Sequence, residues 1–505
     1  MSTGSPPELQ GRQLYPRRWA SLAAISVLVG LVLVISDGFV IAIPAIGRDI
    51  GGSADQMAWA VNGFSLAAGM AGFFGRLGDL IGNRKLVIAG SVILIVGSVF
   101  GGLAGTPGEV IAARVLQGIG GIAIFTCALS VLTLEFPAEE RPKALGINAA
   151  ARWAASGFAV LIIAMLLDSL EWRWIFWTAI PIALLAIGFV VTTTPEVHEL
   201  DGRAKLDLGG ALTLTAASVV LVYALFESDE VPVRTLLPMV GVSALLFGLF
   251  AFVESRSADP LIPPQVWRHR TFTGSMIVNF IFNGILMGVL YLLALYLQTA
   301  KGLGMIDAAS VLLGATITII IMNPFGAQLV RRGYFLLPVV VGMLLVASGC
   351  VVVLLGVKTD SNSVILVGLV ILGAAVGIQL ASISAFQVSF ADASKGMSSA
   401  LLVITIGISN ALGIALATAI MQNVAIHSLQ GATGSNQLEG VSHQQLLDVL
   451  NGSRPPSTVS SAGQQLVVAA FNHGTVVTSA IFAVLALLGA GLALTMLQDI
   501  SIADD

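Results

Sequence analysis

The sequence has 505 residues, of which 56% are hydrophobic and only 10% are charged, and its mean hydropathy is +0.93. A soluble protein carries roughly a quarter charged residues, so this composition excludes a water-soluble fold and indicates a surface that faces lipid. The net charge of −4 and the lack of long basic tracts argue against nucleic-acid binding.

Apolar segments long enough to cross a bilayer recur along the whole chain, and one crossing needs roughly 20 such residues. We predict about fourteen membrane helices, because a helix satisfies its own backbone hydrogen bonds in lipid. Their predicted limits are 19–46, 54–75, 86–106, 109–134, 144–168, 173–193, 207–228, 233–254, 271–297, 308–330, 335–357, 363–388, 398–424 and 465–495. The first segment is too long for a signal-peptide core, so we expect it to be retained.

The spans divide into two halves with an inserted pair between them. The predicted units are an N-terminal six-helix half at 1–200, two inserted membrane helices at 201–256, a cytoplasmic linker at 257–270 and a C-terminal six-helix half at 271–505. The C-terminal half contains a long outer loop, 425–464, in which we expect a short amphipathic helix. A weak echo of residues 75–77 in residues 326–329 supports repeated halves, which are typical of transporters with a mid-membrane substrate site.

Lysine and arginine indicate the orientation of the chain. If the N-terminus lies inside, most of the 24 basic residues fall on the inner side. We therefore expect a plasma membrane protein, of the bacterial inner membrane, with both termini in the cytoplasm.

Three ionisable side chains lie within predicted spans: Asp37, Arg114 and Arg152. Charges inside a membrane are costly, so each is a functional hypothesis by default. We expect Asp37 to exchange protons and to share a polar network with Arg114, directly or through Gln117. The alternatives are a static ion pair for Asp37 and an Arg114 that reaches the outer head groups. For Arg152 we expect a side chain that reaches the cytoplasmic surface; alternatively it faces the cavity and attracts an anionic head group.

Other polar and aromatic side chains in the spans are candidates for a substrate cavity, although each amide could simply cross-link two helices. Together with Arg152, the candidates are Trp59, Asn62, Phe64, Asn279, Asn283, Gln379 and Asn410. The five histidines are scattered, and no phosphate-binding loop occurs. We therefore expect no metal, no cofactor and no enzyme activity.

Two glycine-rich motifs stand out, GRLGDLIGNRK at residues 75–85 and RVLQGIG at residues 114–120. These motifs resemble those of the major facilitator superfamily, in particular its fourteen-span drug:proton antiporter branch. Residues 75–85 resemble the superfamily's signature loop between spans two and three. Residues 114–120, RVLQGIG, are similar to the span-four motif, whose arginine is tied to proton coupling. The stretch 37–49 resembles the span-one motif of the branch. The resemblance extends over essentially the whole chain.

The resemblance implies a conformational latch on the cytoplasmic side that holds the two halves in the outward-facing state. Its residues would be Gly75, Asp79, Gly82, Arg84 and Lys85, with Asp79 and Arg84 as a charge relay. Charges at helix ends can pair with each other and with helix dipoles.

One departure from the branch concerns span five, where a Gly-Pro pair and then a Gly-Gly pair are usual. Here those places hold residues 159–160, AV, and 163–164, IA. We expect a secondary active exporter of amphiphilic small molecules, coupled to protons, that works by alternating access as a monomer among membrane lipids. A lipid or lipid-precursor translocator of the same fold, and a non-transporting membrane sensor or scaffold, remain alternatives.

Overall fold

The protein is built from helices throughout the part that the structure describes. The computed structural model describes residues 17–51, 53–137, 140–196, 208–226, 233–257, 269–389, 395–432, 450 and 461–497. Every regular element in these ranges is a helix. Twelve of the described helices are long and apolar enough to cross a membrane. The predicted all-helical membrane fold is therefore confirmed.

The first half of the chain supplies six of the predicted spans, two of which contain a short 3-10 turn. The first span consists of α1 (Arg18–Gly38), η1 (Phe39–Ala42) and α2 (Ile43–Ile50). The second consists of α3 (Ala54–Leu66), η2 (Ala67–Met70) and α4 (Ala71–Ile81). The remaining spans are α5 (Asn83–Gly102), α6 (Pro107–Glu135), α7 (Arg141–Ser169) and α8 (Trp174–Thr193).

Local sequence explains where several of these helices begin and end. A capping box of Ser53 and Gln56 opens α3, and its reciprocal side-chain and backbone hydrogen bonds satisfy two helix-terminal N–H groups. Gly51 follows α2 at φ +72° and Gly82 follows α4 at φ +105°, both left-handed conformations that favour glycine. We call the two ends of the bundle the Gly51 end and the Gly82 end.

The helix pair α9 (Leu208–Phe226) and α10 (Val233–Glu254), predicted as an inserted pair, follows the first half. Helix α9 packs against η2 and α4 of the first half and against α16 of the second, while α10 packs on α9. The twelve membrane-crossing helices do not include α9 or the interrupted α3–η2–α4, which are the other two of the predicted spans.

The second half consists of α12 (Arg270–Thr299), α13 (Met305–Arg331), α14 (Leu336–Lys358), α15 (Asn362–Ser389), α16 (Lys395–Ala432) and α18 (Ser461–Met496). Helices α16 and α18 have 38 and 36 residues and are longer than predicted. At ~1.5 Å per residue each exceeds the ~30 Å hydrocarbon core of a bilayer. Residues 425–432 of the predicted outer loop are thus helical. Apart from Leu450, the short helix expected in that loop lies outside the described residues.

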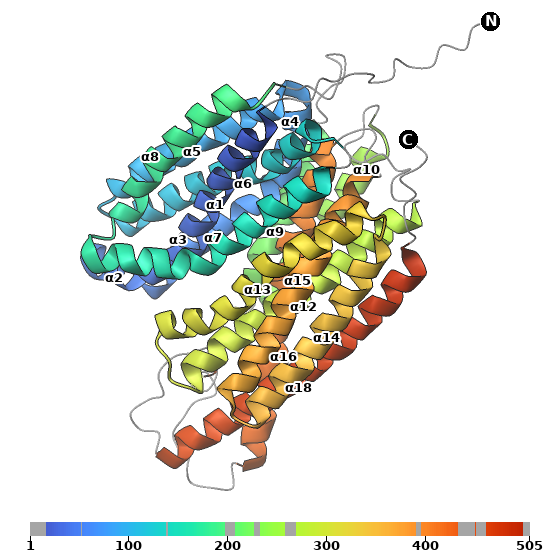
Figure 1. The fold of residues 1–505 in the computed structure, drawn as a ribbon. Coiled ribbons are helices and arrows are strands. Elements are labelled where there is room, and N and C mark those ends of the chain that lie inside the picture. The colour runs from blue at the N-terminus through green and yellow to red at the C-terminus, as the bar shows by residue number, and fades with distance from the viewer. Residues whose placement is uncertain are drawn as a thin grey trace, which may run out of the picture.

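The two halves lie side by side, with the first in blue to teal and the second in yellow to red (Figure 1). Helix α7 packs along α13, where Gly157 lies against Thr316 and Gly146 against Asn323. Helix α4 packs against α16 near the Gly82 end. In Figure 1 the halves converge toward the Gly82 end and separate toward the Gly51 end.

Candidate substrate cavity and coupling site

A cavity of about 390 Å³, the central cavity, lies between the two halves. Helices α1, α6 and α7 of the first half line it, together with α12, α15 and α16 of the second. Much of its wall is apolar and aromatic. Its polar lining consists of Asp37, Asn148, Arg152, Ser156, Asn279, Asn283, Gln379 and Asn410. A mostly apolar wall with a few convergent polar groups is typical of sites for small molecules.

A second hollow of about 420 Å³, the side cavity, adjoins the central cavity. The two cavities share Leu33, Asp37, Phe125, Met287 and Asn410. The side cavity is also lined by Phe64 of α3 and by Val222 of α9. The inserted pair therefore contributes to the walls around the site.

One face of α7 carries three polar residues into the central cavity: Asn148, Arg152 and Ser156. Residues four apart lie on the same side of a helix, so the three form one stripe. The Arg152 guanidinium lies over the ring of Phe125, with its carbon 4.7 Å from the ring centre. The prediction that Arg152 reaches the cytoplasmic surface is therefore wrong. Arg152 lies eleven residues after Arg141, about 16 Å along the helix, which is farther than its side chain extends.

Asp37 lies in the last turn of α1 and is held by α7. The Ser156 hydroxyl donates a short hydrogen bond to Asp37 Oδ2. One more polar contact joins the same two helices, because Asn148 Nδ2 donates to Ser26 Oγ at 3.1 Å. The carboxylate therefore belongs to the α1–α7 contact and borders both cavities.

Arg114 of α6 is completely buried and lies outside both cavities. Its guanidinium donates to the backbone oxygens of Ala60, at 3.1 Å, and Ile35, at 3.2 Å. It also donates to Gln117 Oε1 at 3.1 Å. Its carbon lies 4.1 Å from the ring centre of Phe39 and 4.5 Å from that of Phe64. Arg114 thus fastens α1, α3 and α6 together and does not reach the head groups.

The predicted network of Asp37, Arg114 and Gln117 is divided in two. Gln117 bonds to Arg114, but its Nε2 donates to Ser98 Oγ on α5 at 2.9 Å, so it does not bridge to Asp37. Asp37 and Arg114 form no ion pair and interact only through space. The two side chains are held in different places. Ser156 holds the Asp37 carboxylate on the side of α1 that faces α7, whereas Arg114 donates to the Ile35 backbone oxygen on another side of α1.

The remaining first-half candidates for the cavity lie elsewhere on α3. Trp59 stacks on Tyr223 of α9, with ring centres 5.5 Å apart, and lines neither cavity. Asn62 lines neither cavity as well, and Phe64 lines the side cavity. In the second half, Asn283 Nδ2 donates to Asn279 Oδ1 at 2.8 Å. The described residues offer no partner to Asn279 Nδ2, to the Gln379 amide or to Asn410 Oδ1.

The turn between α4 and α5 carries the residues expected to form the latch. Asp79 is fully buried at the end of α4, near Cys127 of α6, whereas Lys85 is exposed. Arg84 donates to the Val191 backbone oxygen on α8 at 2.6 Å. The expected direct pair of Asp79 and Arg84 is therefore not formed. The tight turn at Gly82 lies between them, and Arg84 extends along α8 instead.

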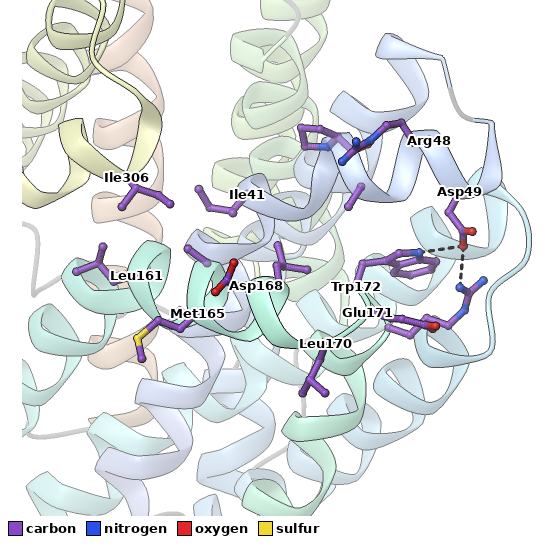
Figure 2. Close-up of a pocket in the computed structure, with 15 residues that line it drawn as sticks. Ile41, Arg48, Asp49, Leu161, Met165, Asp168, Leu170, Glu171, Trp172 and Ile306 are labelled. Atoms are coloured by element: carbon purple, nitrogen blue, oxygen red, sulfur yellow. Dashed lines mark hydrogen bonds and ion pairs between the residues drawn. The ribbon is translucent and has the colours of Figure 1, made fainter.

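A larger hollow of about 940 Å³ lies at the Gly51 end beside α2 and the last turns of α7 (Figure 2). Trp172 Nε1 and the Arg173 guanidinium donate to Asp49 Oδ2 at 3.0 and 2.7 Å (Figure 2). The remaining charged lining residues, Arg48, Asp168 and Glu171, are exposed. Exposed charges in water interact weakly, so we assign this hollow to the surface and the site to the central cavity.

Sequence patterns did not single out Ser156, Asn148 or Glu135. The four-residue spacing from Arg152 was the available signal for the first two. Glu135 is buried in the last turn of α6 and accepts a hydrogen bond from Ser21 at 2.9 Å. Its signal was a carboxylate at the very end of a predicted span.

Known proteins identify the family of the chain. The model of the Major Facilitator Superfamily matches residues 22–421. The chain belongs to this superfamily. It is therefore a membrane transport protein and not an enzyme, as predicted.

Two curated relatives show which transporters this superfamily member is similar to. A puromycin resistance protein of Streptomyces alboniger is 30% identical over 449 residues, which cover 85% of this chain and 87% of that protein. Multidrug resistance protein 3 of Bacillus subtilis is 28% identical, with 64% of this chain and 65% of that protein covered.

Solved structures show the same fold at low sequence identity. A human organic anion transporter is 13% identical with a TM-score of 0.64, and 97% of this chain and 100% of that chain are covered. A proton:xylose symporter is 14% identical with a TM-score of 0.62, and the covered shares are 95% and 96%. These similarities bear on the fold alone.

Proposed function

We propose that this superfamily member is a secondary active exporter of amphiphilic small molecules, coupled to protons and working by alternating access. We further propose that it belongs to the fourteen-span antiporter branch and works as a monomer. We assign it to the bacterial inner membrane, with the Gly82 end and both termini in the cytoplasm. The observation that carries the proposal is the central cavity, which lies between the halves and contains an intramembrane carboxylate. The drug-resistance relatives support the choice of amphiphilic compounds.

The cavity wall suits a ligand that is largely apolar. Phe125, Trp153 and Phe282 offer aromatic faces to its body, and the amides of Asn279 and Gln379 offer hydrogen bonds to its polar atoms. Flat aromatic surfaces and adaptable amides accept many shapes, which is what a broad-specificity exporter needs.

Asp37 is the proposed proton carrier. It borders both cavities, and Ser156 of α7 holds one of its oxygens. Movement of α7 relative to α1 would change the surroundings of the carboxylate and hence its proton occupancy. Arg114 and Gln117 act as positioning residues, because they fix α1 and α3 to α6 beside that carboxylate.

The proposed latch consists of Gly75, Asp79, Gly82, Arg84 and Lys85 at the Gly82 end. Gly75 and Asp79 lie on α4, a helix that packs against α16 across the boundary between the halves. Opening the cavity toward that end requires this contact to separate. The latch residues would therefore tune how often the transporter exposes its site to the cytoplasm.

Efflux from reconstituted vesicles tests the proposal. Wild-type protein should expel a lipophilic dye or antibiotic when a proton gradient is imposed and stop when a protonophore collapses that gradient. Asp37→Asn should lose gradient-driven efflux while it remains folded, and Asp168→Asn, an exposed carboxylate at the Gly51 end, should not. Full gradient-driven efflux by Asp37→Asn would remove Asp37 from the coupling mechanism. Failure of the wild type with a broad set of amphiphiles would contradict the export function itself.

A further inference from the structure

Arg152 lines the central cavity, and its cation is not ion-paired with any residue that the structure describes. Its guanidinium contacts the face of Phe125. Within the described part of the chain, no carboxylate forms an ion pair with it. An uncompensated charge in a low-dielectric interior is costly, whereas a bound anion would compensate it. The guanidinium also offers a planar pair of donors that suits oxygen acids such as carboxylates and phosphates.

Asp37 is the second ionisable residue of the central cavity, and it is not paired with Arg152. Asp37 is held by Ser156, which lies four residues after Arg152 on α7. The four residues from Arg152 to Ser156 rise about 6 Å along α7, so the backbone positions that carry the guanidinium and the serine that holds the carboxylate are separated by about that distance. Among the described residues, Arg114 also acts on Asp37 through space, and it lies outside both cavities.

We propose that the central cavity recognises a dipolar amphiphile, with an anionic oxygen-acid group at Arg152 and a cationic amine at Asp37. This inference rests on the proposed export function and names its substrate class. The apolar body of the ligand packs against Phe125 and Phe282, and unpartnered amides such as Gln379 bond to its remaining polar atoms.

Ligands with a single charge fit this arrangement less well. An anion compensates Arg152 but is repelled by the Asp37 carboxylate, and a cation compensates Asp37 but is repelled by the guanidinium. A ligand with both charges compensates both residues and adds no net charge to the cavity. The amine of such a ligand and a proton also compete for the same carboxylate, which is the relation that exchange of substrate for protons requires.

Equilibrium binding to the full chain in lipid nanodiscs tests this without any transport step. Four fluorescent probes share one dansyl-alkyl body and differ only in the head group. The head groups are an uncharged amide, an ammonium, a carboxylate, and an ammonium joined to a carboxylate by three methylene groups. We expect the dipolar probe to bind about tenfold more tightly than each of the others, since a charge-assisted contact contributes enough for a tenfold change in Kd.

Single substitutions assign each charge to its residue. Arg152→Gln should remove the advantage of the dipolar probe over the ammonium probe, and Arg152→Lys should keep most of it. Asp37→Asn should remove the advantage over the carboxylate probe. Arg332→Gln, an exposed arginine after α13, should leave all four affinities unchanged and serves as the matched control. Retention of the wild-type elution volume verifies folding of each variant.

The proposal is overturned if the dipolar probe binds no more tightly than the uncharged one, if none of the probes binds, or if the carboxylate probe binds best. It is also overturned if Arg152→Gln leaves the order of affinities unchanged. Vesicle efflux is measured separately: selective binding without efflux contradicts the export function alone, and efflux without selective binding contradicts this inference alone.

Discussion

Ser156 donates its hydroxyl hydrogen to Asp37, so the carboxylate of α1 is held by α7 and not by the nearby Arg114. Helix α7 also forms one of the contacts with the second half, through α13. The same helix therefore touches the carboxylate, carries Arg152 and borders the other half of the transporter. Movement between the halves can reach Asp37 through this one helix.

Removal of the Ser156 hydroxyl tests this link between α7 and Asp37. We expect Ser156→Ala to slow the proposed proton-driven efflux roughly tenfold, because a hydrogen bond to a charged group contributes about 1.5 kcal/mol or more. Ser156→Thr keeps a hydroxyl and should restore most of the rate. Ser310→Ala on α13, where the exposed hydroxyl bonds only to its own helix, is the control. Wild-type rates in Ser156→Ala would show that the bond is dispensable.

Arg114 should not tolerate lysine, although lysine keeps the charge. The planar guanidinium donates in three directions and lies against two rings, and an ammonium cannot reproduce this geometry. We expect Arg114→Lys to lower the free energy of unfolding by roughly 2–4 kcal/mol, measured by denaturation in detergent. Arg48→Lys replaces an exposed arginine that bonds within α2 and should have little effect. Equal stability of the two variants would contradict the structural role.

The pair of Arg18 and Glu140 should make stability depend on pH at the Gly82 end. Arg18 Nε donates to Glu140 Oε2 at 2.9 Å, and this hydrogen bond holds the pKa of Glu140 below its ordinary value of 4.5. A lowered pKa in the folded state stabilises the fold above pH 4.5, and this contribution is lost as pH falls through the lowered pKa.

We therefore expect Glu140→Gln to lower the midpoint of thermal unfolding at neutral pH and to have no effect in acid below both pKa values. Glu171→Gln is the matched control, because Glu171 is exposed and pairs with no described residue. A difference between wild type and Glu140→Gln that persists unchanged in acid would rule out the ion pair as its cause.

The crossing of α12 and α16 depends on two glycines in contact. A Cβ atom on Gly413 would collide with the backbone of Gly284, which cannot move aside as a side chain can. We expect Gly413→Val to lower the free energy of unfolding by about 2–3 kcal/mol. Gly248→Val on α10 makes the same change where the space is open, so it isolates the crossing from helix propensity. Similar stability of the two variants would show that the crossing can adjust.

Hydropathy was sufficient to find the helices, because lipid leaves few other choices for the backbone. The 3-10 turn η1 was not predicted, although its cause is in the sequence. Pro44 has no N–H to offer, so the Val40 carbonyl accepts from Ile43 N–H instead and the helix tightens. The extra length of α16 was not predictable from hydropathy, because residues beyond 424 are more polar while the helix continues.

The sequence predicted how deep in the membrane the residues of the candidate site lie, but not which way their side chains face. Hydropathy placed Arg152 inside a span, yet the face it occupies depends on how α7 meets its neighbours. Gly146 and Gly157 let one side of α7 pack closely against α13. Asn148, Arg152 and Ser156 lie on another side of α7 and therefore face the cavity. Whether Asp37 bonds to Arg114 or to Ser156 is likewise set by packing that a single sequence does not contain.

The length of α16 and α18 could be used to prepare this protein for electron microscopy. A small transporter embedded in a detergent micelle gives particle images with almost no features for alignment. The ends of these two helices, which are longer than one bilayer crossing requires, could carry a grafted helical fusion or bind an antibody fragment at a distance from the cavity-lining residues of α16. Such a fiducial would allow the exporter to be imaged in each state of its cycle.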